Sequence, residues 1–201
     1  MPVHLTKRMA DMKAICELAD RHEVPVAEDA AQVIDSLLHG RLAGSWGHVG
    51  CLSARPLKNL NACSDAGFVS TNDTEITKKI KLQRNHGLIN REIVENFGHV
   101  SKMDTIQAVI LSFRLSRLLD VIRRRQENAD LYRSILNRKY VFWMEDESTR
   151  KNSWYTFVIQ VDQRDEFRAK SARCAIETAI HYPISIHLQP AANRLGYHEG
   201  D

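Results

Sequence analysis

The stretch VGCLSARPLKNLNACSD, residues 49–65, decides the fold of this chain. Its first six residues form an apolar run typical of a buried strand, Pro56 ends the run, and Lys58 follows at once. A second stretch upstream, VPVAEDAAQ at residues 24–32, is also a short apolar run, and it closes with a glutamate and Asp29. Together the two stretches place a carboxylate at the end of one predicted strand and a lysine just past the end of another.

The residues before the second stretch complete a strand–helix–strand pattern. Residues 2–5 read as a short strand, and the apolar residues of 12–19 fall on one face of a predicted helix. At this spacing the unit implies parallel strands joined by a right-handed crossover. Ligands of open α/β sheets bind at the carboxyl ends of the strands, which places Asp29 where it would meet one. The competing interpretation of Asp29 is a helix N-cap or a turn residue.

Helical patterns dominate the middle of the chain. A strand at residues 67–70 precedes a helix that Asn72 or Asp73 can cap and that Gly87 ends. From Asp104, apolar residues at spacings of three and four mark a long amphipathic helix with a basic flank, which we interpret as a solvated face.

The last third of the chain predicts a small α+β unit. Its expected elements are strands at residues 140–143 and 154–161, a helix at 165–174, and a further strand and loop within 176–186. The predicted organisation is therefore a partial large α/β domain, a long bridging helix and an incomplete small C-terminal α+β domain, at residues 1–102, 103–137 and 138–201.

Composition narrows the functional classes. A net charge of +3 and 26% charged residues give no reason to expect a nucleic acid or an anionic membrane as partner. No apolar run approaches the length of a membrane span, and the first residues lack the apolar core of a signal peptide. The four cysteines are scattered and no HExxH motif occurs, which argues against disulfides and a metal site. A reducing cytoplasm fits this pattern best.

The lysine and the carboxylate suit the chemistry of pyridoxal 5'-phosphate (PLP). A PLP site needs a lysine that forms a Schiff base with the cofactor aldehyde and a carboxylate that pairs with the pyridine nitrogen. Lys58 and Asp29 are the candidates for these two roles, and Ser53 could supply a hydroxyl to the phosphate. The competing interpretation of Lys58 is a solvated lysine that happens to follow a strand.

Several motifs, in one order along the chain, carry a resemblance to a known family. They are EDAAQ (28–32), GxxGCLSxxPxKN (47–59), DAGFVSTN (65–72), LQRNHG (82–87), SKMDTIQAVIL (101–111) and IHYPISIHLQPAANRLGYHEGD (180–201). In this order they resemble the DegT/DnrJ/StrS family of PLP-dependent sugar aminotransferases. The resemblance implies an α/β fold: the C-terminal part of a fold type I, aspartate aminotransferase-like large domain, with a mostly parallel sheet and helices, followed by a small α+β domain.

The resemblance also implies roles for four residues at the cofactor. Lys58 matches the lysine that forms the Schiff base, and Asp29 matches the partner of the pyridine nitrogen. Gln32 matches a glutamine that contacts the cofactor ring, and Ser53 matches a phosphate ligand.

Two histidines match a loop near the sugar-nucleotide site of the family. They are His181 and His187, and the competing interpretation of each is a hydrogen-bonded loop residue. Asn85 and His86 match another family motif, for which we expect a structural role.

The reaction implied by the resemblance moves an amino group from an amino acid donor, typically glutamate or glutamine, to a keto group of a nucleotide-linked sugar. Such reactions serve aminosugar, cell-surface polysaccharide and antibiotic sugar biosynthesis. Lys58 would also move the proton between donor carbon and cofactor. A related dehydrating branch carries histidine in place of the lysine, so Lys58 favours the aminotransferases. Family sites lie at dimer interfaces, which implies a homodimer.

Departures from the family pattern suggest an alternative. No counterpart is seen of the family's N-terminal half, with its phosphate-binding turn and ring-stacking aromatic residue. Val100 stands where an asparagine is common, and Ser64 and Ala66 stand in a turn that is usually rich in glycine. We therefore expect the chain alone to be marginally stable and to associate. The alternative function is a truncated, non-catalytic remnant that acts at most as a dimerisation module.

Overall fold

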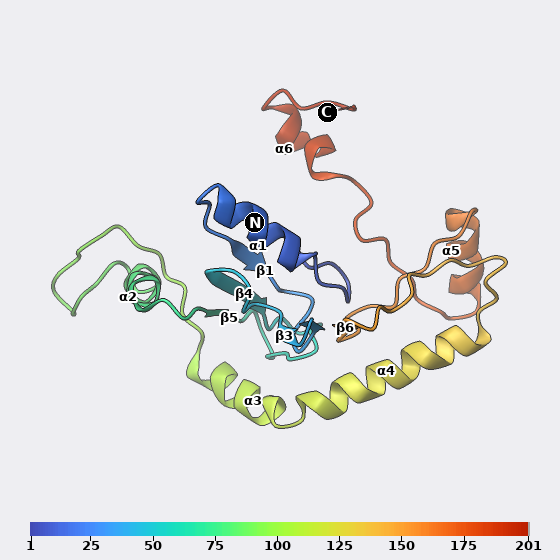
Figure 1. Ribbon diagram of the computed structural model, residues 1–201, viewed down its shortest axis with the longest axis horizontal. Helices are drawn as coiled ribbons and strands as arrows, with labels where there is room; N and C mark the ends of the chain where they lie inside the picture. Colours follow the sequence, from blue (N-terminus) through green and yellow to red (C-terminus); the bar gives the residue numbers. More distant parts are fainter. Residues whose placement is uncertain (201) are drawn as a thin grey trace. The chain divides into compact units, whose positions relative to one another are not determined.

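The computed structural model describes residues 1–200 of the 201-residue chain (Figure 1). These residues form two compact units. The first comprises Met1–Arg138 and Trp143–Ile159, and the second comprises Lys139–Phe142 together with the chain from Gln160 onward. Within residues 1–200, no helix has both the length and the apolar character needed to cross a membrane.

A three-stranded sheet lies at the centre of the first unit. Its strands are β1 (Ala27–Asp29), β4 (Val49–Ser53) and β5 (Gly67–Ser70), in the order β1-β4-β5 (Figure 1). Strand β1 runs parallel to β4, with Asp29 opposite Cys51, whereas β5 runs antiparallel to β4. The expected strands were thus found, although the one predicted at residues 24–27 begins later, at Ala27.

The predicted strand–helix–strand unit is present in reduced form. Its first member is a single parallel bridge between Val3 and Asp29 instead of a full strand. The connecting helix α1 (Met12–Arg21) buries Met12 in an apolar cluster that also contains Val26, Ala30 and Val33. This packing fixes the end of β1, where Asp29 lies.

Helix α2 (Thr74–Gln83) has the termini that the sequence predicts. The Asp73 side chain accepts hydrogen bonds from the backbone N–H groups of Glu75 and Ile76, at 2.7 and 3.1 Å. Gly87, with φ of 72°, follows the helix in the left-handed region. A Cβ at Gly87 would lie 1.6 Å from the carbonyl oxygen of Asn96, so only glycine fits this turn.

The long amphipathic helix predicted after Asp104 is interrupted. The structure has two helices, α3 (Thr105–Leu115) and α4 (Leu118–Ile135). At the break, the Ser116 hydroxyl donates to the carbonyl of Phe113 at 2.7 Å, a local bond that competes with helix continuation. Both helices bury leucines against the segment that carries Lys58. The shared cluster comprises Ala54, Leu60, Ala62, Leu111, Leu118 and Ile122.

A second, antiparallel sheet joins distant parts of the first unit. Its three short strands are β3 (Arg41–Leu42), β2 (Leu37–Leu38) and β6 (Arg150–Lys151), in the order β3-β2-β6. These strands were not predicted, because two-residue strands have no detectable period. Their pairing brings the segment around residue 150 beside Leu38.

The second unit contains less regular structure than the sequence suggests. The helix expected at residues 165–174 is α5 (Arg164–Arg173). The strands expected at 140–143 and 154–161 meet only in one bridge, between Phe142 and Gln160. The strand expected within 176–186 is not formed: residues 176–185 have no regular secondary structure, and η1 (Ile186–Leu188) and α6 (Pro190–Asn193) follow them. Without a partner strand, that segment has no ladder to join.

Candidate active site

Lys58 lies in a turn just beyond the end of β4. Its backbone N–H donates to the carbonyl of Arg55 at 2.9 Å, and its half-buried side chain extends over the ring of Tyr155. The Lys58 Nζ atom is 4.2 Å from the centre of that ring. Among residues 1–200, no carboxylate forms an ion pair with it.

The surroundings of Lys58 favour a reactive amine. Burial lowers the pKa of Lys58 below its ordinary value of 10.5. The negative charge of Asp29 partly offsets this effect on the Lys58 pKa, and the positive charge of Arg55 adds to it. A larger share of neutral amine at a given pH makes a lysine a better nucleophile and proton acceptor.

Asp29 is the last residue of β1 and is held on both sides. Its backbone N–H donates to the carbonyl of Pro2 at 2.9 Å, and its carbonyl accepts from the N–H of His4 at 3.0 Å. Its side-chain Oδ1 accepts from the backbone N–H of Ala31 at 3.1 Å. Asp29 is therefore also a turn residue, as the competing interpretation suggested, while its charge acts on Lys58. The structure brings these two predicted residues together.

Gln32 and Ser53 lie on the segments that follow Asp29 and precede Lys58. The Gln32 Oε1 atom accepts a 2.6 Å hydrogen bond from the backbone N–H of Thr6, which fixes the orientation of the amide. Ser53, half-buried at the end of β4, lines a groove of about 560 Å³ together with Ser101 and Lys102. Its Oγ atom is 3.5 Å from the backbone nitrogen of Arg55.

A buried carboxylate that no sequence pattern indicated as a site residue, Glu28, lies next to Asp29. Glu28 is fully buried, and its Oε2 atom lies 3.0 Å from His4 Nε2 and accepts from Gly44 N–H at 2.9 Å. Its Oε1 atom accepts from the N–H groups of Trp46 and Gly47, at 2.6 and 2.7 Å. Burial alone would raise the pKa of Glu28, but these hydrogen bonds together lower it. The available signal was a glutamate within an apolar run, followed by a Gly-rich segment able to supply N–H donors.

A second missed feature is the segment that carries Tyr155. The side chain of Asn59, next to Lys58, donates a 2.6 Å hydrogen bond to the carbonyl of Ser153. The Ser153 N–H in turn donates to Ser36 Oγ at 3.1 Å. No local sequence pattern predicts this contact, because it joins residues 94 positions apart.

The two candidate histidines of the sugar site lie in the second unit. His181 is exposed, with its ring edge-on to that of Tyr182 at 5.4 Å. His187 is half-buried within η1. Their role at a sugar site stays a prediction. In the first unit, the backbones of Asn85 and His86 join the loop after α2 to Val100 and His99, as their expected structural role requires.

The whole chain resembles known aminotransferases. Residues 1–201 match the DegT/DnrJ/EryC1/StrS aminotransferase family. The pleiotropic regulatory protein of Geobacillus stearothermophilus is 36% identical over 203 residues, which cover 100% of this chain and 55% of the relative. The dTDP-3-amino-3,4,6-trideoxy-alpha-D-glucose transaminase of Streptomyces venezuelae is 35% identical over 192 residues, covering 95% of this chain and 51% of the relative.

Solved structures confirm the α/β fold. DesV of S. venezuelae, solved in complex with a ketimine intermediate, superposes with a TM-score of 0.93 at 34% identity. The match covers 99% of this chain and 54% of that one. A DegT DnrJ EryC1 StrS aminotransferase from Brucella abortus gives 0.90 at 30% identity, covering 95% and 51% of the two chains. The chain spans about half the length of the relatives it matches.

Proposed function

Because this chain belongs to the DegT/DnrJ/EryC1/StrS aminotransferase family, we propose that it contributes the reactive lysine of a PLP-dependent sugar aminotransferase. The enzyme would move an amino group from an amino acid donor to a keto group of a nucleotide-linked sugar. The observation that carries this proposal is the environment of Lys58. Its amine is half-buried, has a lowered pKa and interacts electrostatically with Asp29. It forms no ion pair within residues 1–200. Relatives named as transaminases of dTDP- and UDP-linked sugars support the substrate class.

The residues of the first unit fit PLP. Lys58 supplies an amine, Asp29 a carboxylate, Gln32 an oriented amide and Ser53 a hydroxyl on the groove. When bound, PLP supplies an aldehyde carbon for covalent attachment of amines and a ring that accepts electrons from the substrate carbon. Asp29 would hold the pyridine nitrogen in its protonated form, and Ser53 would donate to the phosphate.

Lys58 would carry the proton of the reaction. Its lowered pKa leaves more of the amine neutral near pH 8, so that Nζ can take a proton from the donor carbon and return it at the neighbouring position. The carboxylate of Asp29, oriented by Ala31 N–H, adds a fixed negative charge next to the amine. His181 and His187 are proposed to contact the sugar nucleotide, and a homodimer is the proposed assembly.

A borohydride-trapping experiment tests the function. The chain is incubated with PLP, reduced with borohydride, digested and analysed by mass spectrometry. We expect close to one adduct per chain, at Lys58, and its loss in Lys58→Arg. Asp29→Asn should reduce the yield, whereas Asp165→Asn, which removes an exposed ion pair with Arg164 and does not line the groove, is the matched control.

The alternative is a chain that acts at most as a dimerisation module. Large apolar side chains are exposed in the segment between α2 and α3, which favours association. They are Ile89, Ile93, Val94, Phe97 and Val100. Adducts scattered over many lysines would support this alternative over the aminotransferase, whereas a stable dimer in sedimentation is expected under both.

A further inference from the structure

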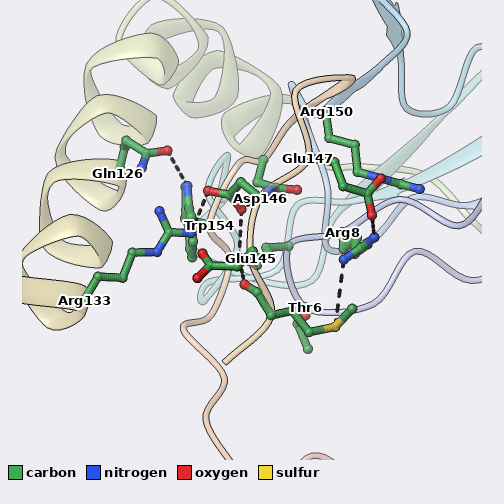
Figure 2. Close-up of polar contacts among 12 residues, drawn as sticks. Thr6, Arg8, Gln126, Arg133, Glu145, Asp146, Glu147, Arg150 and Trp154 are labelled. Carbon is green, nitrogen blue, oxygen red and sulfur yellow. Dashed lines mark hydrogen bonds and ion pairs between the residues drawn. The ribbon is translucent and has the colours of Figure 1, made fainter. Parts of the chain in front are cut away.

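The buried indole of Trp154 lies next in sequence to the ring that contacts Lys58. Trp154 is only 3% exposed, and two cations lie against its ring: Lys7 Nζ at 3.7 Å and Arg133 Cζ at 4.6 Å from the centre. Asp146 accepts from both cations, at 3.0 and 2.6 Å. Figure 2 shows Gln126 and Arg133 reaching from α4 toward Trp154, whose Nε1 donates to Gln126 Oε1. These contacts fix the indole in place.

The backbone on either side of Trp154 is fixed as well. Arg125, on α4, donates to the carbonyls of Trp154 and Tyr155 at 3.2 and 3.0 Å. The carbonyl of Ser153 accepts from Asn59 at 2.6 Å. Trp154 itself has φ of 53°, which turns the chain between two otherwise fixed residues. Contacts to the Trp154 ring and hydrogen bonds from Arg125 and Asn59 thus hold the segment, while the Tyr155 side chain stays half-exposed over Lys58.

We propose that Tyr155 is a positioning residue for Lys58, whose amine it covers and withdraws from water because the fixed segment 152–155 holds its ring in place. This role of Tyr155 rests on the proposed function of Lys58, because a covered amine stays neutral and in a fixed position. The ring itself, and not the phenol hydroxyl, does this, so phenylalanine should substitute for tyrosine.

Two effects of the ring on Lys58 oppose each other. Covering the amine disfavours its charged form, whereas the attraction between ammonium and ring favours it. The cation–π attraction is weak at a partly exposed site, and the strongest influence on Lys58 is burial, with Asp29 as the main opposing charge. Loss of the ring should therefore raise the pKa of Lys58.

Competitive reductive methylation without PLP measures this directly. The chain is treated with trace formaldehyde and cyanoborohydride from pH 7 to 11, and the labelling of Lys58 is read by peptide mass spectrometry. Tyr155→Leu should raise the midpoint by about half a pH unit, which lowers labelling at pH 8 about threefold. Tyr155→Phe should keep the wild-type profile. Lys13, exposed on α1, is the internal control and should not change.

A ring-preserving substitution covers the case in which Tyr155→Leu does not fold. In the chain that carries 4-fluorophenylalanine at position 155, a ring without a titratable hydroxyl, the ¹⁹F signal should titrate with the Lys58 midpoint. The titration should vanish in Lys58→Met. An unchanged Lys58 profile in a folded Tyr155→Leu, or a ¹⁹F signal at position 155 that does not titrate, overturns the proposal. Neither readout involves PLP, so a failure of the PLP adduct at Lys58 remains a separate result.

Discussion

The Nε2 atom of His4 lies 3.0 Å from Oε2 of Glu28, and both side chains are fully buried. Three backbone N–H groups of the segment 44–47 complete the shell of Glu28. A buried carboxylate is tolerated only when its lone pairs are filled in this way. Glu28 therefore ties the start of the chain and the segment before β4 to β1, the strand that ends in Asp29.

Removal of this carboxylate should destabilise the fold strongly. Glu28→Ala leaves three backbone N–H groups and the buried His4 without their acceptor, and we expect a loss of about 3–5 kcal/mol in the free energy of unfolding. Urea denaturation followed by circular dichroism measures it. Glu17→Ala, on the exposed face of α1, is the matched control and should change stability by less than about 0.5 kcal/mol. Equal effects of the two substitutions would contradict the role assigned to Glu28.

Acid should remove the same contribution. The folded pKa of Glu28 lies below its ordinary value of 4.5, so its contribution to stability is present above that pH. It is lost as the pH falls through the lowered folded value. The wild-type chain should therefore lose more stability between pH 5 and 3 than Glu28→Gln, measured by urea midpoints at each pH. Parallel curves for the two proteins would show that Glu28 does not titrate in this way.

The carboxylate of Asp146 pairs with both cations beside Trp154 and so tests how much these contacts contribute to stability. Asp146→Asn weakens the pairing with Lys7 and Arg133, which lie 3.0 and 2.6 Å away, and we expect a loss of about 1–3 kcal/mol. The exposed pair of Arg55 and Asp65 provides the contrast, since Asp65→Asn should cost at most about 1 kcal/mol. Thermal unfolding compares them. A larger effect at Asp65 would show that the partly buried network around Asp146 contributes little.

A comparison of Gly87 with Gly40 separates the effect of backbone strain on stability from the effect of steric conflict. Gly87→Ala places a Cβ 1.6 Å from the Asn96 carbonyl oxygen at a φ of 72°, and we expect a loss well above about 1 kcal/mol. Gly40 has a similar φ of 76° with no atom within 4 Å, so Gly40→Ala should cost only about 1 kcal/mol. Urea denaturation of both variants gives the difference. Equal losses would mean that the loop after α2 moves to accept the new methyl group.

Local signals predicted the parts of the fold that depend on local chemistry. The short apolar runs identified β1, β4 and β5, and the caps at Asp73 and Gly87 identified the ends of α2. The interruption between α3 and α4 was not predicted, because the apolar spacing continues through Ser116 while its hydroxyl bonds the backbone.

The residues of the candidate site also divide into those that local signals predicted and those that they did not. Lys58 and Asp29 were found because each lies at or just past the end of an apolar run within a motif. Tyr155 was assigned only to a predicted strand, since its place over Lys58 depends on the distant contact of Asn59 with Ser153. Glu28 escaped notice because its partners lie in a loop whose conformation no local pattern specifies.

The pairing of residues 7–9 with residues 146–150 also has a consequence for folding during synthesis. Lys7 meets Asp146, Arg8 meets Glu147, and Arg150 donates to the carbonyl of Met9, contacts that span about 140 positions. At ribosomal rates of roughly 5–20 residues per second, Lys7 waits on the order of ten seconds before its partner emerges. The first unit is therefore completed by residues made late, and synthesis arrested before residue 144 leaves Lys7 and Arg8 without the carboxylates that pair with them.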